Sequence, residues 1–209
     1  MIYIRIGALF LFIFNHHFGL SQKLEKNVKD SLAIVVSEMY ERDQKYRKFM
    51  LWRTTDTLKI DSIQSLSFKK RYKIITSQTS LPQATMDSLW NLQSINDSLN
   101  FEHLVSLLKE YGFLSKKRIG VGYLNTIILH MMHDDEFCIL DTLLIQEVEK
   151  GNLSPKSYAS WYDRYLLITG QAQLYGEYNT YTPCVTSLEE TNRAREKIGL
   201  KKLKKNICP

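Results

Sequence analysis

The sequence predicts an all-α fold, a single-domain helical bundle with one ordered irregular loop near residues 170–186. Apolar residues recur at three- and four-residue spacing through most of the chain, which is the period of one face of a helix. Capping residues and glycines mark the ends of these segments, and there is no strand pair, hairpin dipeptide or internal repeat. The 209 residues suffice for one domain with a hydrophobic core but are few for two.

Residues 1–21 have the composition of a signal peptide. They combine a positively charged start, an apolar core too short to cross a bilayer, and small residues at the −3 and −1 positions of a cleavage site. We therefore expect an exported protein, periplasmic or secreted, with a single helical domain over residues 22–209 and no membrane span after cleavage. An uncleaved N-terminal anchor is the alternative. The residues concerned are Arg5, 8–14, Gly19 and Ser21.

Three helices are expected in the first half of this domain. Residues 23–52 keep five apolar residues on one face and predict a long first helix. A second helix is expected through residues 67–75, and a third from about Thr85 to Ser98, after Pro82. The apolar face of the first helix consists of Leu24, Val28, Leu32, Val35 and Met39.

The middle of the chain predicts three further helices. Asn100 can cap a helix that ends at Gly112. Ser115 is expected to open a single helix with four apolar residues on one side, and another helix is expected over residues 134–150, ending at Gly151. The four apolar residues are Val121, Leu124, Ile128 and Met131.

Two more helices have clear start and stop signals. One begins with Ser154 as a cap and a proline at the first helical position, and ends at Gly170. The other begins with a capping box of Ser187 and Glu190, and ends at Gly199.

The segment between these two helices, GQAQLYGEYNTYTP at residues 170–183, has no helical period. A loop of this length is usually functional or disordered, and its three tyrosines argue against disorder. We expect an ordered loop packed over the bundle, with a short strand-like piece at residues 172–175.

Charge gives a weak indication of partners. The chain has 28 basic and 22 acidic residues and a formal net charge of +6. Much of the excess lies near the C-terminus, where no aromatic residues are interleaved to stack with bases, so a solvated end is favoured and no nucleic-acid partner is expected. These basic residues are Arg193, Arg195, Lys197, Lys201, Lys202, Lys204 and Lys205.

The chain has three cysteines, which in an oxidising compartment allow one internal disulfide and leave one thiol. Cys184 and Cys208 flank the last helix and could be joined, whereas Cys138 lies among apolar residues and is expected to be a buried thiol. No cysteine spacing suits zinc, and no metal or other cofactor is expected.

The densest group of candidate site residues is HMMHDDE, residues 130–136. His130 and His133 fall on a polar strip of the expected helix, and with Asp134 they could hold a metal ion. The familiar helical spacing for metal ligands is different, however, and the three acids suit the first turn of the next helix. Motifs of nucleophilic enzymes and phosphate-binding loops are missing from the sequence.

Two other charged pairs need partners. Asp163 and Arg164 are neighbours on a helix and point in different directions, so each must be satisfied elsewhere. Asp43 and Arg47 stand four residues apart and either form a surface ion pair or belong to a site.

Six short motifs relate these residues to a known family. Between about Met39 and Leu203 the chain resembles an uncharacterised bacterial family, domain of unknown function sixty-six twenty-four. The resemblance implies a fold and a set of site residues but no reaction, and it favours His133 over His130. The chain departs from the family pattern at Met132 and Tyr178, where the family has Gln. The matching residues are Asp43, Gln44 and Arg47; Asp97, Asn100, Tyr111 and Gly112; His133; Asp163 and Arg164; Gln173, Tyr175 and Gly176; and Asn192, Arg195, Gly199, Leu200 and Leu203.

Two functions are compatible with this set. The favoured one is a binding or interaction module for a small molecule or an envelope protein, in which the polar residues lock the loop onto the bundle. Its polar site is expected at His133, Asp163, Arg164 and Gln173. The alternative is an exported hydrolase-like enzyme, with His133 as general acid or base, Asp163 orienting it, and Arg164 or Arg195 holding an anionic group. In both, the predicted ligand-binding residues are Asp43, Gln44, Arg47, Gln173, Tyr175, Gly176 and Arg195.

Overall fold

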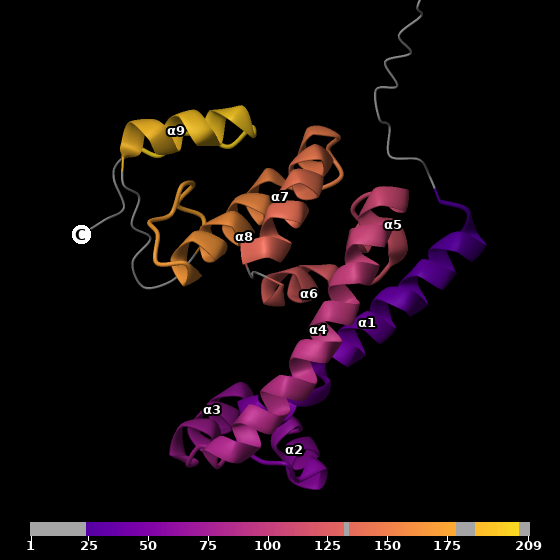
Figure 1. Cartoon of the computed structure of the whole chain (residues 1–209), viewed down its shortest axis with the longest axis vertical. Helices are drawn as coiled ribbons and strands as arrows, with labels where there is room; N and C mark the ends of the chain where they lie inside the picture. Colours follow the sequence, from indigo (N-terminus) through magenta and orange to yellow (C-terminus); the bar gives the residue numbers. More distant parts are fainter. Residues whose placement is uncertain (1–23, 132–133, 179–186, 205–209) are drawn as a thin grey trace, which may run out of the picture.

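The computed structural model describes residues 24–131, 134–178 and 187–204, and over these residues the predicted all-α fold is confirmed. A long antiparallel pair of helices forms its axis, with two short helices at one end and most of the others beside the opposite end (Figure 1). The helices of the described residues are α1 (Lys26–Trp52), α2 (Thr57–Gln64), α3 (Phe68–Ser77), α4 (Gln83–Tyr111), α5 (Lys116–Ile119), α6 (Leu124–His130), α7 (Asp134–Glu149), α8 (Pro155–Ile168) and α9 (Leu188–Lys197).

The main hydrophobic core lies between α1, α4, α6, α7 and α8. The residues that face it follow the helical period, so each helix buries one stripe of side chains. None of the described helices has both the length and the apolar character needed to cross a membrane. Core side chains with almost no exposed surface include Val36, Met39, Leu104, Ile127, Ile128, Leu140 and Leu144.

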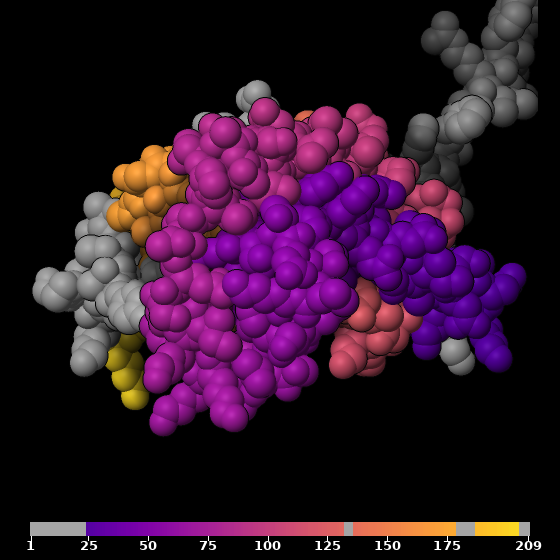
Figure 2. Space-filling view, turned by 90° about the horizontal axis from the view of Figure 1, so that it is seen from below, coloured from indigo at the N-terminus to yellow at the C-terminus, as the bar shows by residue number. Residues whose placement is uncertain are grey.

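Helices α2 and α3 form a separate lobe at the lower end of the long pair, shown end-on in Figure 2. Helix α2 lies between the first two predicted helices, in a segment for which no helix was predicted. It starts where the Asp56 side chain accepts a hydrogen bond from the Lys59 N–H (3.2 Å). Its buried residues Ile60 and Ile63 pack against Trp52, the last residue of α1. This small cluster is the second core of the described chain.

The predicted helix break before Asn100 is wrong. Residues 83–111 form one helix, α4, and Asn100 is fully buried in its interior. Its side-chain amide donates to the Met39 carbonyl (2.9 Å), and its side-chain oxygen accepts from Arg42 (3.0 Å). The side-chain amide of Asn100 therefore joins α4 to α1 instead of capping a helix end.

The single helix predicted from Ser115 is also wrong. It is divided into α5 and α6, because Gly120 adopts a left-handed φ of 89° and ends α5 after one turn. Most residues prefer to avoid this conformation, whereas glycine adopts it without steric cost. The division lets Ile119 and Leu124 both reach the core.

The remaining helix predictions are confirmed. Ser154 accepts a hydrogen bond from the Ser157 N–H at the start of α8, and Ser187 accepts one from the Glu190 N–H at the start of α9. The loop from residue 170 is ordered over its described part, up to Tyr178. The strand-like piece expected there is reduced to one isolated bridge residue, Gln173.

Candidate functional site

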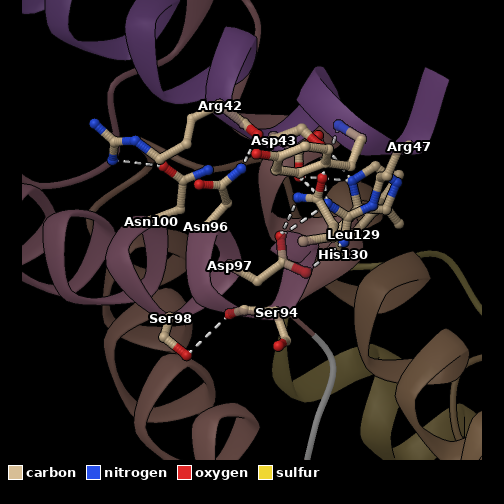
Figure 3. Close-up of polar contacts among 12 residues, drawn as sticks. Arg42, Asp43, Arg47, Ser94, Asn96, Asp97, Ser98, Asn100, Leu129 and His130 are labelled. Atoms are coloured by element: carbon tan, nitrogen blue, oxygen red, sulfur yellow. Dashed lines mark hydrogen bonds and ion pairs between the residues drawn. The ribbon is translucent and has the colours of Figure 1, made fainter. Parts of the chain in front are cut away.

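The first polar network centres on Asp43, a fully buried carboxylate in the middle of α1. The Nδ1 atom of His130, at the end of α6, lies 2.9 Å from both carboxylate oxygens (Figure 3). Because a carboxylate only accepts hydrogen bonds, Nδ1 carries the proton and a neutral ring has its free lone pair on Nε2. The His130 side chain is 25% exposed, and no described residue makes a hydrogen bond with Nε2.

Arg47 joins Asp43 to a second carboxylate on the neighbouring long helix. Its guanidinium donates to Asp43 Oδ1 (3.0 Å) and makes two parallel hydrogen bonds to Asp97 of α4 (2.8 Å each). Figure 3 shows the Asp97 carboxylate directed at this guanidinium. Bidentate pairing of this kind fixes both the position and the plane of the guanidinium.

Two glutamine side chains complete the network. Gln93, fully buried on α4, donates to Asp97 (2.8 Å) and accepts from the Tyr46 N–H of α1 (3.2 Å). Gln44 donates to Asp43 (2.6 Å). Each buried carboxylate therefore has several donors, which is the condition under which buried charge is tolerated.

The sequence left open whether Asp43 and Arg47 form a surface ion pair or belong to a site. Burial distinguishes this pair from a surface ion pair. Asp43 is 0% exposed, and the Arg47 side chain is 14% exposed. The pair therefore belongs to the interior contact between α1, α4 and α6. Ion pairs with little exposed surface are screened much less by salt than surface pairs.

The second polar network holds the loop after α8. Asp163, fully buried on α8, accepts hydrogen bonds from three loop N–H groups: Leu174 (2.8 Å), Tyr175 (2.8 Å) and Glu177 (2.7 Å). Burial raises the pKa of Asp163, although these N–H groups oppose the increase. Asp163 thus organises the loop backbone, and it forms no ion pair with Arg164, as expected.

Gln173 and Arg195 close the loop from its other side. The Gln173 side-chain oxygen accepts from the Tyr178 N–H (3.1 Å), while its buried Nε2 has no hydrogen-bond partner in the described part of the chain. Arg195 of α9 donates to the Tyr175 carbonyl (2.6 Å) and to Glu177 (2.9 Å). The loop is therefore attached to both α8 and α9.

A cluster of aromatic residues supports this loop. Tyr175 is buried and packs edge-on against Tyr162 and Tyr158. Burial raises the pKa of the Tyr175 hydroxyl to about 12. Burial also raises the pKa of Tyr158, which donates to Asp141 (2.6 Å), so both hydroxyls stay protonated well above pH 7. Gly176 follows with a left-handed φ of 69°.

Arg164 connects the two networks. Its Nε donates to the carbonyl of Leu129 (3.2 Å), the residue before His130, and its Nη1 donates to the Tyr178 hydroxyl (2.6 Å). The guanidinium also lies over the Tyr178 ring, 5.7 Å from its centre. Unlike Arg47 and Arg195, Arg164 forms no ion pair with a carboxylate of the described residues.

The structure thus assigns the predicted residues to two groups. Asp43, Gln44 and Arg47 belong to the network around His130, and the rest belong to the loop network. His133, the predicted acid or base, lies outside the described residues, as do Cys184 and Cys208. The loop-network residues are Asp163, Arg164, Gln173, Tyr175, Gly176 and Arg195.

Sequence reasoning gave too little weight to His130 and to two residues of α4, Gln93 and Asp97. His130 had been placed on a polar strip, but its partner lies 87 positions away. Gln93 and Asp97 are four residues apart on α4, and this spacing was the available signal that they share one face. The prediction that Cys138 is buried is wrong, since its side chain is exposed on α7.

Two hollows of the described surface lie next to these networks. One, of about 620 Å³, includes Gln44 and Asn96 between α1 and α4, beside the Asp43 network. The other, of about 630 Å³, lies under α9 and includes Tyr158, Tyr175 and Arg193. Over the described ranges, no three His, Cys, Asp or Glu side chains are grouped so that they could hold a metal ion.

Comparisons with protein-family models, with curated proteins and with solved structures find no match to this chain.

Proposed function

We propose that the protein is a binding module for a small anionic molecule, with Arg164 and His130 as the groups that contact the ligand. The observation that carries the proposal is the state of Arg164. This half-buried guanidinium is held in place by two neutral oxygens, and no carboxylate of the described residues neutralises it. A fixed arginine whose remaining N–H groups bond to no described residue is suited to a carboxylate or phosphate group.

His130, the residue after the Leu129 carbonyl that Arg164 binds, supplies the second proposed contact group. Its Nδ1 is occupied by Asp43, so the ring is oriented and Nε2 is left for a ligand. The backbone contact between Arg164 and Leu129 brings the guanidinium next to the residue that precedes His130. A preorganised imidazole and guanidinium lower the entropic cost of binding, because neither side chain must be ordered by the ligand.

The other polar residues support the site without contacting a ligand. Asp163 and Arg195 make hydrogen bonds to the loop that carries Tyr178, and the Tyr178 hydroxyl in turn accepts a hydrogen bond from Arg164. This is the arrangement expected of a rigid binding site: contact residues locked by a surrounding network. We also propose that the chain is exported and belongs to the family that its motifs resemble.

Thermal unfolding in the presence of inorganic phosphate, acetate, succinate and citrate tests this proposal. A ligand at a hundred times its Kd stabilises the folded state by about 2.7 kcal/mol, which raises the Tm by about 5–11 °C in a chain of this size. We expect at least one of these anions to do so, and Arg164→Gln to abolish the increase.

Two variants make the result specific. Arg193→Gln removes the same charge from a side chain that is 65% exposed, and it should leave the increase unchanged. His130→Asn keeps a donor toward Asp43 and removes Nε2, so it should weaken the effect. Equal responses of the original chain and the Arg164 and Arg193 variants to every anion would exclude the proposed site.

An acid–base enzyme is a second candidate, favoured by the geometry of His130 and Asp43. A histidine whose Nδ1 is held by a buried carboxylate is oriented as a general base through Nε2. A hydrolase substrate screen would compare the original chain with His130→Asn and, for the histidine predicted from the sequence, His133→Ala. Activity that survives both substitutions would exclude histidine catalysis at this site.

A further inference from the structure

Helix α3, far from the site along the chain, concentrates positive charge. Its sequence, FKKRYKIITS, contains four basic residues and no acidic one. Lys69, Lys70 and Lys73 are exposed, whereas Arg71 is half-buried. The preceding helix and its cap contribute two acids, Asp56 and Asp61, so the charge balance of the lobe remains positive.

The same helix exposes two large aromatic side chains. Phe68 is 75% exposed and Tyr72 is 62% exposed, and their rings are stacked with centres 6.4 Å apart. Helix α3 is anchored from its other side by Ile74 and Ile75, which pack against the Trp52 cluster. With a rotation of about 100° per residue, Tyr72, Lys69 and Lys73 therefore lie on the outward side of the helix. Phe68 and Lys70 lie at the two edges of that side and are exposed as well.

The position of α3 leaves this half accessible to a large flat partner. Helices α2 and α3 lie at one end of the long α1–α4 pair, and Figure 2 shows that their residues form the projecting face seen from that end. Leu51 and Leu58, at the two sides of the turn between α1 and α2, are 56% and 79% exposed. The lobe thus combines exposed aliphatic, aromatic and cationic side chains.

We propose that the α2–α3 lobe docks the protein on the surface of an anionic lipid bilayer. Phe68 and Tyr72 enter the interface between headgroups and acyl chains, and the lysines contact lipid phosphates. The exposed leucines favour a bilayer over a nucleic acid, because aliphatic groups gain free energy in lipid and offer no face for a base to stack on. The inference is independent of the anion site at Arg164.

Cosedimentation with vesicles tests the inference. The protein used in this assay begins at Gln22 and so lacks the apolar N-terminal segment. It retains all described contacts, because these lie within residues 24–204. It should bind vesicles of phosphatidylcholine with phosphatidylglycerol, bind poorly to phosphatidylcholine alone, and dissociate as salt increases. Equal binding to the two kinds of vesicle would contradict the proposal.

Three matched variants identify the surface. Each lysine near an anionic membrane contributes about fivefold in partition, so replacing Lys69, Lys70 and Lys73 together by Gln should weaken binding about a hundredfold. Replacing Phe68 and Tyr72 by Ser should weaken it at all salt concentrations. The control replaces three basic residues of the C-terminal segment by Gln and should bind as the original chain does. These control residues are Lys201, Lys202 and Lys204.

Two further measurements keep the result decisive. Circular dichroism and thermal unfolding should be unchanged in the lysine variants, since the substituted side chains are exposed. In a Tyr72→Trp variant, the fluorescence should shift to the blue on addition of anionic vesicles. An equal loss of binding in the control triple, or preferential binding of a single-stranded oligonucleotide through the same three lysines, would overturn the assignment to lipid.

Discussion

Replacement of Asp163 by Asn probes the group that organises the loop. The two side chains have nearly the same shape, but an amide has one accepting oxygen where the carboxylate has two. In the native chain Oδ1 accepts from Leu174 and Tyr175, and Oδ2 accepts from Glu177. In the variant one edge therefore presents an NH2 group to a backbone N–H, and that hydrogen bond is replaced by a repulsive contact.

The expected cost follows from these three bonds. A hydrogen bond to a charged group contributes about 1.5–3 kcal/mol, and a buried N–H left without a partner costs about 1–3 kcal/mol. Asp163→Asn removes one bond and weakens the other two, so we expect a loss of about 3 kcal/mol in the free energy of unfolding. For a chain of this length this corresponds to a decrease of about 6–12 °C in Tm.

Urea denaturation and amide hydrogen exchange measure the effect. The matched control is Asp30→Asn, which changes the same charge at an exposed position of α1. The amides of Leu174, Tyr175 and Glu177 should lose protection in the Asp163 variant and keep it in the control. If both variants unfold at the same urea concentration and exchange alike, Asp163 does not organise the loop.

Three further predictions concern other parts of the bundle. Glu147 is buried, but hydrogen bonds from Lys150 and its other donors outweigh the effect of burial and lower its pKa. The ionised carboxylate therefore stabilises the fold fully above its ordinary pKa near 4.5, and this stabilisation is lost as pH falls through the lower pKa of the folded state. Glu147→Gln should cost about 2 kcal/mol at pH 7 and less at pH 3, measured by urea denaturation; an equal cost at both pH values would contradict this explanation. Gly112→Ala should destabilise the folded state by about 3 kcal/mol, because φ is 68° and the new Cβ would lie 2.5 Å from Glu147 Oε2. Gly120→Ala is the control: φ is 89° but the space around it is open, so it should cost only the backbone strain of about 1–2 kcal/mol. Cys138 is exposed, so it should react with a thiol reagent in the folded protein. Cys138→Ser should remove one fast-reacting thiol per chain, and an unchanged number of fast-reacting thiols would show that Cys138 is covered.

Local signals in the sequence were sufficient to predict most helices. Caps such as Ser154 and Ser187, and terminators such as Gly112, act within a few residues, so a sequence pattern records them directly. Asn100 was misinterpreted because the same amide that can cap a helix can also bond to a neighbouring helix. Only the packing of α4 on α1 decides between these two roles.

The site was less predictable because its contacts join distant positions. The residue types of Asp163 and Arg164 indicated that each needs a partner, but the partners of Asp163 are backbone N–H groups, which every residue except proline carries. His130 appeared to be one of several residues on a polar strip, since nothing in the sequence links it to Asp43. Residue chemistry thus identified candidates, and tertiary packing determined which of them meet.

Calorimetric titration of the protein with the anion that most raises its Tm tests the central claim most directly. The account predicts saturable binding at one site per chain, abolished by Arg164→Gln, weakened by His130→Asn and unchanged by Arg193→Gln. Binding that is the same in the Arg164→Gln variant as in the original chain would contradict it.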